Sequence, residues 1–201
     1  MNFDFNFSTD YVLENEHVLI RPFKIEDLSL LAYFAIDEPT LWEFSPKLIA
    51  GEENFKVHFQ EALAAKENKK EYPFIVFDKK QQQYAGSTRF YDVQLANKTV
   101  QLGYTWYGKK FQGSGLNKHC KYLLLQFAFE KMKMERVEFR AHAGNERSIA
   151  AMKTIGCVVE GIMRSCVPMP DGLRRSTIVL SILKEEWETN VKRLLKEKIT
   201  K

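Results

Sequence analysis

The chain has 201 residues, of which 45% are hydrophobic, and this is enough to bury the core of one globular domain. Its 30 Lys and Arg residues are interspersed with 26 Asp and Glu residues, and a net charge of +4 without a basic stripe argues against a nucleic-acid-binding protein. No apolar run approaches the ~18 residues of a membrane span, and the first ten residues do not resemble a signal peptide. We therefore expect a cytoplasmic protein with no membrane partner.

The first half of the chain predicts two helices and a meander of strands. Alternating apolar residues before Pro22 indicate a strand, and Glu26 and Asp27 open a helix that Pro39 ends. Residues 1–16 show no strong pattern, and we expect them to pack loosely or to form an arm. The predicted elements are a strand at 17–23, helices at 26–38 and 51–68, and antiparallel strands at 72–77, 84–93 and 100–107.

The second half predicts a long helix, a strand, a short helix and a hairpin. Val137, Phe139 and Ala141 lie on one face of a strand that follows a helix, so this strand is expected to run parallel to the strand at 100–107. The predicted elements are a helix at 116–132, a strand at 136–141, a helix at 145–156 and hairpin strands at 157–164 and 173–183. An amphipathic helix at 184–198 is expected to dock on the sheet or to form a homodimer contact. Its apolar stripe contains Trp187, Val191, Leu194 and Leu195.

A glycine-containing turn precedes the long helix that begins at Leu116. The first amides of a helix lack intrahelical partners and the helix dipole adds positive charge there, so an anion fits this position. Gly113 and Gly115 allow positive φ and close approach of a phosphate, and four lysines between residues 109 and 121 surround the turn. The alternative is that the glycines only form the turn and the lysines are a solvated face. The nucleotide-binding patterns GxGxxG and GxxxxGK[ST] do not occur here.

The segment QGSGLN at 112–117 resembles the Gln/Arg-x-x-Gly-x-Gly/Ala loop of the GCN5-related N-acetyltransferases, which binds the pyrophosphate of acetyl-coenzyme A (acetyl-CoA). Asn117 stands where Gly or Ala is usual, in a variant similar to one seen in RimJ/RimL-type ribosomal-protein N-acetyltransferases. Further segments match this branch in order and spacing: LIRP at 19–22, LGY at 102–104, NERS at 145–148, EGIMR at 160–164 and DG at 171–172. Together these segments are more specific than the loop alone.

The resemblance implies an α/β (α+β) fold in which helices flank a mixed central sheet of about six to seven strands. It implies one domain over residues 1–201, with its core at 18–183 and the amphipathic helix at 184–198. It also implies transfer of the acetyl group of acetyl-CoA to a primary amine by direct attack in a ternary complex. The acceptor suggested by this branch is a protein N-terminal α-amine.

The resemblance also assigns residues to the cofactor. Backbone groups of the strand at 100–107 would pair with the pantetheine arm, the loop amides would bind the pyrophosphate, and Asn145 would contact the pantetheine. The implied cofactor-binding residues are Tyr104, Thr105, Trp106, Gln112, Gly113, Ser114, Gly115, Leu116, Asn117, Asn145 and Ser148.

The departing thiolate leaves more readily if it is protonated, since a thiol has a pKa near ~8.5. The resemblance implies that Ser148 faces the cofactor sulfur and is the candidate acid for this step. The alternative is that Asn145 is a helix N-cap and Ser148 is a polar residue of the first turn. The acceptor amine must also lose a proton, and the carboxylates of Asp92 and Glu43 are candidate bases. A base is not indispensable, because proximity and orientation supply much of the acceleration in direct transfer.

Other functions stay open at this point. A non-catalytic acyl-CoA-binding module would need the cofactor loop but no acid or base, and an acetyltransferase for small amines would differ only in its acceptor. A nucleic-acid-binding protein is a weaker third alternative, since it rests on the lysines near the loop. The three cysteines and four histidines show neither CxxC nor metal-ligand spacing, so we expect reduced thiols and no metal cofactor.

Overall fold

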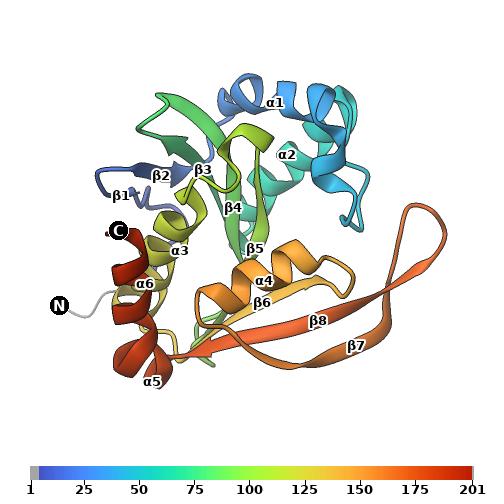
Figure 1. The fold of residues 1–201 in the computed structure, drawn as a ribbon. Helices are drawn as coiled ribbons and strands as arrows, with labels where there is room; N and C mark the ends of the chain where they lie inside the picture. The colour runs from blue at the N-terminus through green and yellow to red at the C-terminus, as the bar shows by residue number, and fades with distance from the viewer. Residues whose placement is uncertain (1–4, 201) are drawn as a thin grey trace.

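The computed structural model describes residues 5–200, so the prediction for residues 1–4 lies outside the described residues. One mixed sheet has the strand order β1-β2-β3-β4-β5-β6-β8-β7 (Figure 1). The strands are β1 (Leu13–Glu14), β2 (Val18–Pro22), β3 (Glu71–Asp78), β4 (Gln83–Gln94), β5 (Thr99–Tyr107), β6 (Arg136–His142), β7 (Val158–Pro168) and β8 (Arg174–Leu183). Neighbouring strands of this sheet are antiparallel except β5 and β6, which run parallel as predicted.

The predicted α/β fold with a mixed central sheet is confirmed, but the sheet has eight strands, one more than the upper limit of the predicted six to seven. β1 contains only Leu13 and Glu14, which pair with Ile20 and Leu19 of β2. Two residues are too few to produce a period-two pattern, so sequence periodicity does not detect this edge strand.

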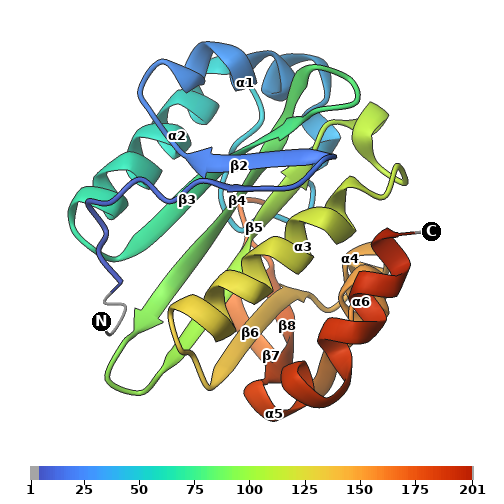
Figure 2. The same ribbon diagram turned by 90° about the vertical axis from the view of Figure 1, so that its left-hand side faces the viewer.

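Helices cover both faces of the sheet (Figures 1 and 2). They are α1 (Asp27–Asp37), α2 (Glu52–Glu67), α3 (Leu116–Gln126), α4 (Glu146–Thr154), α5 (Lys184–Glu186) and α6 (Lys192–Ile199). Two short 3₁₀ helices are η1 (Pro39–Trp42) and η2 (Lys109–Phe111), and the π-helical turns η3 (Phe127–Lys131) and η4 (Trp187–Val191) follow α3 and α5 directly. On β5, the Trp106 ring packs against Phe34 of α1 and Phe55 of α2, whereas Thr105 contacts Lys121 of α3. Adjacent β5 side chains therefore face opposite helix layers.

The described part of the N-terminal segment packs on the sheet. Phe5 and Phe7 are buried, and the Phe5 ring lies 5.5 Å from the Tyr72 ring of β3 and 6.2 Å from the Phe127 ring. The Tyr11 amide donates a hydrogen bond to the Tyr72 hydroxyl at 3.0 Å. The expectation of a loose arm is therefore wrong for residues 5–16, because their aromatic side chains pack against rings that are distant in sequence.

The C-terminal helical segment of α5, η4 and α6 packs mainly on α3 and its extension, and it also contacts the end of α4 through Lys198 and Thr154 (Figure 2). Trp187 is fully buried, its ring stacks on Phe129 at 5.6 Å, and its indole N–H donates to Glu130 at 3.1 Å. The expected homodimer contact stays a prediction. Within residues 5–200, no helix combines the length and apolar character needed to cross a membrane.

β5 and β6 separate after a short parallel pairing. They pair from Thr99 with Arg136 to Gln101 with Glu138, although both strands continue well beyond these residues. A β-bulge places Tyr104 at φ 48°, in the left-handed region, where two β5 residues oppose one β4 residue. The backbone of β5 after Gln101 therefore has no strand partner on the side of β6 among the described residues, and a gap opens there.

The hairpin of β7 and β8 is longer than predicted. β7 runs to Pro168 rather than to residue 164, with an irregular register between Met163 and Val167. Ser165 adopts φ 49° within this irregular stretch. This break in the alternation of side chains explains why sequence periodicity does not show that the strand continues. As a result, the turn of the hairpin reaches past the N-terminal end of α4 (Figure 1).

Candidate active site

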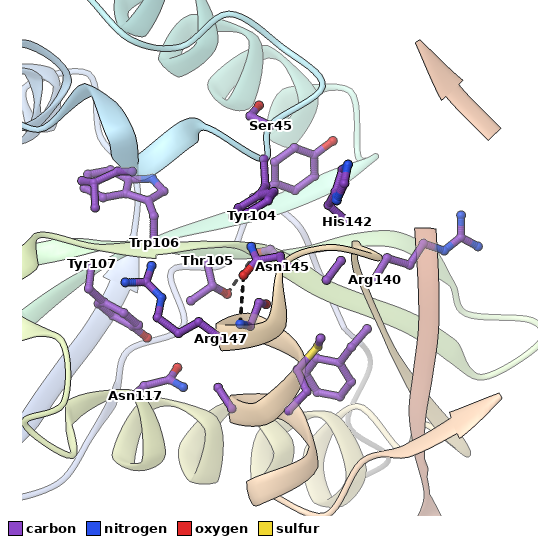
Figure 3. Close-up of a pocket in the computed structure, with 18 of the residues that line it drawn as sticks. Ser45, Tyr104, Thr105, Trp106, Tyr107, Asn117, Arg140, His142, Asn145 and Arg147 are labelled. Carbon is purple, nitrogen blue, oxygen red and sulfur yellow. Dashed lines mark hydrogen bonds between the residues drawn. The ribbon is translucent and has the colours of Figure 1, made fainter. Parts of the chain in front are cut away.

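A cavity of about 650 Å³ lies where β5 and β6 separate (Figure 3). Most of its walls come from η1 and the loop after it, from β5, from the loop before α3, and from α3, α4, β6 and β8, and α2, β4 and β7 contribute single residues or pairs. Tyr107, Asn117 and Arg147 lie toward one end, whereas Ser45 and His142 lie at the other. We call these the loop end and the β8 end, because Arg175 of β8 lines the cavity near the second group.

The loop end contains the N-terminus of α3. Gly113 and Gly115 adopt φ 75° and 90°, and a Cβ atom on either would meet nothing within 4 Å. The glycines are therefore needed for backbone conformation, and the space beside them is open. Gly115 at the N-cap of α3 has no side chain that could bond the first amides. The Leu116 amide meets the Ser114 hydroxyl only at a long 3.4 Å, and the Lys118 amide donates to the Gly115 carbonyl at 2.9 Å. With the positive end of the helix dipole beside open space, this terminus suits an anion.

The predicted loop residues divide into two groups. Gln112, Gly113, Gly115 and Asn117 line the cavity. The Asn117 side-chain oxygen is buried and has no hydrogen-bond partner among the described residues. Ser114 and Leu116 do not line the cavity. The Ser114 hydroxyl donates to the Phe111 carbonyl at 2.7 Å and Leu116 is a core residue, so both shape the loop.

Asn145 and Ser148 lie together at the start of α4 and both line the cavity. The Asn145 side-chain oxygen accepts a hydrogen bond from the Ser148 amide at 3.0 Å, drawn as a dashed line in Figure 3. Asn145 is therefore the N-cap of α4. Arg147 of the same turn donates to Gln112, which links α4 to the loop before α3.

Tyr104, Thr105 and Trp106 of β5, the three strand residues that the resemblance assigned to the pantetheine arm, all line the cavity. The Thr105 hydroxyl lies 2.7 Å from the Thr88 hydroxyl and accepts a hydrogen bond from Lys121 Nζ at 2.9 Å.

Lys121 is a site residue that sequence reasoning missed, since it was counted only among the lysines around the turn. It lines the cavity, is 5% exposed, and pairs with no carboxylate among the residues that the structure describes. Burial lowers the pKa of Lys121 to about 8. Its position three residues before the buried Leu124 was the available signal, because this spacing places Lys121 on the apolar face of the helix.

Two histidines line the cavity, but neither offers a free lone pair. Arg89 can only donate, so His58 Nε2 accepts its hydrogen bond at 3.1 Å and Nδ1 carries the proton of the neutral ring. Burial, followed by the charge of Arg89, lowers the pKa of His58 to about 3. His142 Nδ1 accepts from the Gly144 amide at 2.9 Å, so its proton is on Nε2. In this arrangement both rings are hydrogen-bond donors toward any further partner rather than bases.

The two predicted carboxylate bases do not line this cavity. Asp92 lies near the end of β4 and accepts a hydrogen bond from Gln101 at 2.8 Å. Glu43 is exposed after η1 and lines a separate, smaller hollow with Met169, Pro170 and Asp171 of the turn between β7 and β8. No Asp or Glu of the described chain lines the large cavity, and no group of three metal-ligating side chains occurs in the same residues.

Comparisons with known proteins agree with this architecture. A family model described as "Acetyltransferase (GNAT) domain" matches residues 17–158. YdaF of Bacillus subtilis (strain 168), named as a candidate ribosomal N-acetyltransferase, is 32% identical over 103 residues. This match covers 51% of the chain and 55% of YdaF, so it spans about half the length of that relative.

Solved structures share the fold over nearly the whole chain. A candidate acetyltransferase from T. thermophilus is 32% identical with a TM-score of 0.82, and the match covers 94% of this chain and 96% of that one. RimJ of Mycobacterium smegmatis, solved in complex with CoA-disulfide, is 18% identical with a TM-score of 0.78, covering 94% and 93% of the two chains. At this lower identity the likeness concerns the fold alone.

Proposed function

Because the chain belongs to the GCN5-related N-acetyltransferase (GNAT) family, we propose that it transfers the acetyl group of acetyl-CoA to a primary amine by direct attack in a ternary complex. The observation that carries this proposal is one continuous cavity that joins the N-terminus of α3, where Gly115 is the N-cap, to the edge of β5 that β6 leaves unpaired after Gln101. A phosphate-bearing thioester with a long flexible arm requires both features together.

The residues at the loop end fit acetyl-CoA. Amides between Gln112 and Asn117 would bind the pyrophosphate, since the space beside Gly113 and Gly115 is open. The side chains of Lys118 and Arg147 line the same end and would add positive charge. Acetyl-CoA supplies the thioester whose carbonyl carbon the amine attacks. Backbone groups of Tyr104, Thr105 and Trp106 would orient the arm, and one of their amides would stabilise the developing oxyanion.

We assign the acceptor to the class of peptide N-terminal α-amines. The amine attacks as the free base, and an α-amino group has a pKa near ~8 whereas a lysine side chain has one near ~10.4. A cavity that none of the described carboxylates lines therefore suits the α-amine better, because this amine needs less help to lose its proton. The name of YdaF, a candidate ribosomal N-acetyltransferase, is in line with this class. Asp92 and Glu43 stay proposals as bases and would act through water.

The cofactor loop is tested by Gly115→Val. A β-branched side chain disfavours φ 90°, so the variant should lose at least about tenfold in coenzyme A affinity, measured by isothermal titration calorimetry. Gly172→Val is the matched control, because Gly172 also has positive φ and open space but lies in the turn between β7 and β8. A folded Gly115→Val protein with unchanged affinity would refute the assignment of the loop.

Ser148 is our candidate for protonation of the leaving thiolate. Ser148→Ala should lower kcat about tenfold or more and leave coenzyme A affinity nearly unchanged, because the Ser148 amide that binds Asn145 is retained. Steady-state kinetics with a peptide acceptor, combined with calorimetry, separates the two effects. Equal turnover of variant and wild type would remove Ser148 from the mechanism and leave it as a residue of the first turn.

The runner-up function is a non-catalytic acyl-CoA-binding module, and the lack of a carboxylate among the described lining residues favours it. A panel of N-terminal peptides and small amines, incubated with acetyl-CoA and followed by mass spectrometry, separates the two functions. Acetylated peptide supports the enzyme. Tight coenzyme A binding with no acetylated product across the panel supports the module instead.

A further inference from the structure

The charged residues that line the cavity in the described chain are all basic. Although the chain contains 26 Asp and Glu residues, none of those described lines the cavity. The basic lining residues are Lys47, Lys118, Lys121, Arg140, Arg147 and Arg175. Lys47 and Arg140 are neutralised by Glu61 and Glu138, each at 2.6 Å. The other four have no carboxylate partner in the described part of the chain, so the cavity carries a net positive charge.

Arg175 is set apart from the other unneutralised cations by its position. Lys118 and Arg147 lie at the loop end, where cofactor phosphates would meet them, and Lys121 is held on the α3 side by Thr105. Arg175 projects from β8 and contacts the loop after η1, so no phosphate of a loop-bound cofactor accounts for its charge.

The Arg175 guanidinium is fixed in place with spare donors. Its Nη1 donates to the Phe44 carbonyl at 2.9 Å and its Nε to the Thr177 hydroxyl at 3.2 Å, while Nη2 donates to no group among residues 5–200. The side chain is half-buried, and burial lowers the pKa of Arg175. This partly desolvated guanidinium is held by two neutral groups and therefore lacks a negatively charged partner. A carboxylate fits it best, because the two carboxylate oxygens can accept two parallel N–H bonds from one guanidinium.

Other groups at the β8 end also offer donors. His142 carries its proton on Nε2, because its Nδ1 accepts from the Gly144 amide, and its ring lies 5.3 Å from the Phe44 ring. The Tyr104 hydroxyl makes no hydrogen bond with described residues, and Figure 3 shows Tyr104, His142 and Ser45 together at this end. A cation surrounded by neutral donors, without a carboxylate, selects an anion and repels additional positive charge.

We propose that the acceptor amine carries a carboxylate close to it, as in an acidic peptide N-terminus or a free amino acid, and that Arg175 binds this carboxylate. This inference rests on the proposed function: with the pyrophosphate at the loop end and the arm along β5, the β8 end is the part of the cavity left for the acceptor. It excludes polycationic acceptors such as polyamines, because they would bring several positive charges to a lining in which no described acidic residue can pair with them.

A charge series of acceptors tests the proposal. Peptides that begin Ser-Asp-Asp, Ser-Asn-Asn and Ser-Lys-Lys, together with free aspartate and spermidine, are compared by kcat/KM at low and high salt. We expect the acidic peptide to exceed the neutral one by at least about tenfold, and the basic peptide and spermidine to be poorer still. Activity on free aspartate would identify the acceptor as an amino acid. Activity on the acidic peptide but not on aspartate would identify it as a protein N-terminus.

Arg175→Gln identifies the responsible side chain. The variant should lose about tenfold in kcat/KM toward the acidic peptide and change little toward the neutral one, whereas a purely structural defect would affect both peptides equally. Arg174→Gln is the matched control, because Arg174 is exposed on the same strand, bonds to Ser165 and does not line the cavity. Equal effects on both peptides, or equal use of acidic and basic peptides by the wild type, would overturn the proposal.

Equilibrium binding separates this inference from the proposed function. The labelled acidic peptide is titrated with coenzyme A-saturated protein and followed by fluorescence anisotropy. If no amine is acetylated but the acidic peptide binds in an Arg175-dependent manner, the anion site stands and the enzymatic function fails. If acetylation proceeds without a preference for acidic acceptors, the function stands and the anion site is refuted.

Discussion

Lys121 occupies a position that otherwise belongs to the apolar face of α3. Cys120 and Leu124 beside it are fully buried, and within the described chain the ammonium group of Lys121 donates to the neutral hydroxyl of Thr105. An ammonium group that is buried without a counterion destabilises the folded state. Because this lysine also lines the cavity, we expect its charge to serve the site rather than the fold.

Lys121→Met should therefore stabilise the protein, by on the order of 3 kcal/mol at pH 7, because burial lowers the pKa of Lys121 from 10.5 to about 8. The unfolded chain holds this proton up to about pH 10.5 and the folded chain only up to about pH 8. Wild-type stability thus rises with pH across this window, and the advantage of the variant shrinks. Urea unfolding at about pH 7 and about pH 9.5 measures the difference.

Lys118→Met is the control for this prediction, because Lys118 lies on the same helix but is only half-buried. Its effect on the free energy of unfolding should be small at both pH values. A stability gain in Lys121→Met that stays constant between the two pH values would show that the gain comes from packing rather than from removal of a buried charge.

At the scale of elements, hydrophobic periodicity located most helices and strands to within a few residues. It did not identify which elements pack against one another. The stripe predicted for the C-terminal helix contains Trp187 and Leu195, which are buried, and Leu194, which is 36% exposed. The pattern correctly indicated an amphipathic helix. It did not distinguish docking on the sheet from docking on α3. An apolar stripe shows that one face of the helix is buried, but it does not show which element of the fold buries that face.

The contribution of this segment is tested by Trp187→Ala. The Trp187 ring stacks on Phe129 and its N–H donates to Glu130, so its removal leaves a cavity and takes a donor from that carboxylate. We expect a loss of about 3–5 kcal/mol in the free energy of unfolding, measured by urea denaturation. Leu194→Ala, on the exposed edge of the same stripe, should cost well under half as much. Similar losses in both variants would contradict docking through Trp187.

At the scale of the whole molecule, net charge and local charge differ. The chain carries only +4, yet the cavity is lined by basic residues and by none of the described acidic ones. The described acidic residues lie elsewhere, and some neutralise basic residues at the rim, as Glu61 does for Lys47. A modest overall charge therefore concealed a positive cavity, because composition does not report where charges gather.

This distribution predicts that coenzyme A binding is sensitive to salt. Raising the ionic strength from about 0.05 M to about 0.5 M should weaken coenzyme A binding severalfold or more and reduce the Tm increase that it produces, because the Debye length falls from roughly 14 Å to about 4 Å. Pantetheine, which lacks the diphosphate, is the matched ligand and should show little salt dependence. Identical salt dependence of the two ligands would place the nucleotide away from the α3 terminus.

The sequence by itself determined the turn before α3 and the order of the elements except β1, and the order strand, helix, strand indicated the parallel pairing of β5 with β6. These features follow from local rules, since alternation, helical phase and glycine conformation are properties of neighbouring residues. The same rules offered a helix N-cap as the alternative role of Asn145, beside its implied contact with the pantetheine, and the bond to the Ser148 amide shows that Asn145 is the cap.

Only the tertiary structure decided which side chains meet in the cavity. It left Asp92 and Glu43 outside and brought in Lys121 and Arg175, although neither had been assigned to the site. It also showed that His58 and His142 are donors, because their partners, Arg89 and the Gly144 amide, fix which nitrogen holds the proton. The physical reason is that burial and electrostatic environment depend on contacts between distant segments, which local pattern does not encode.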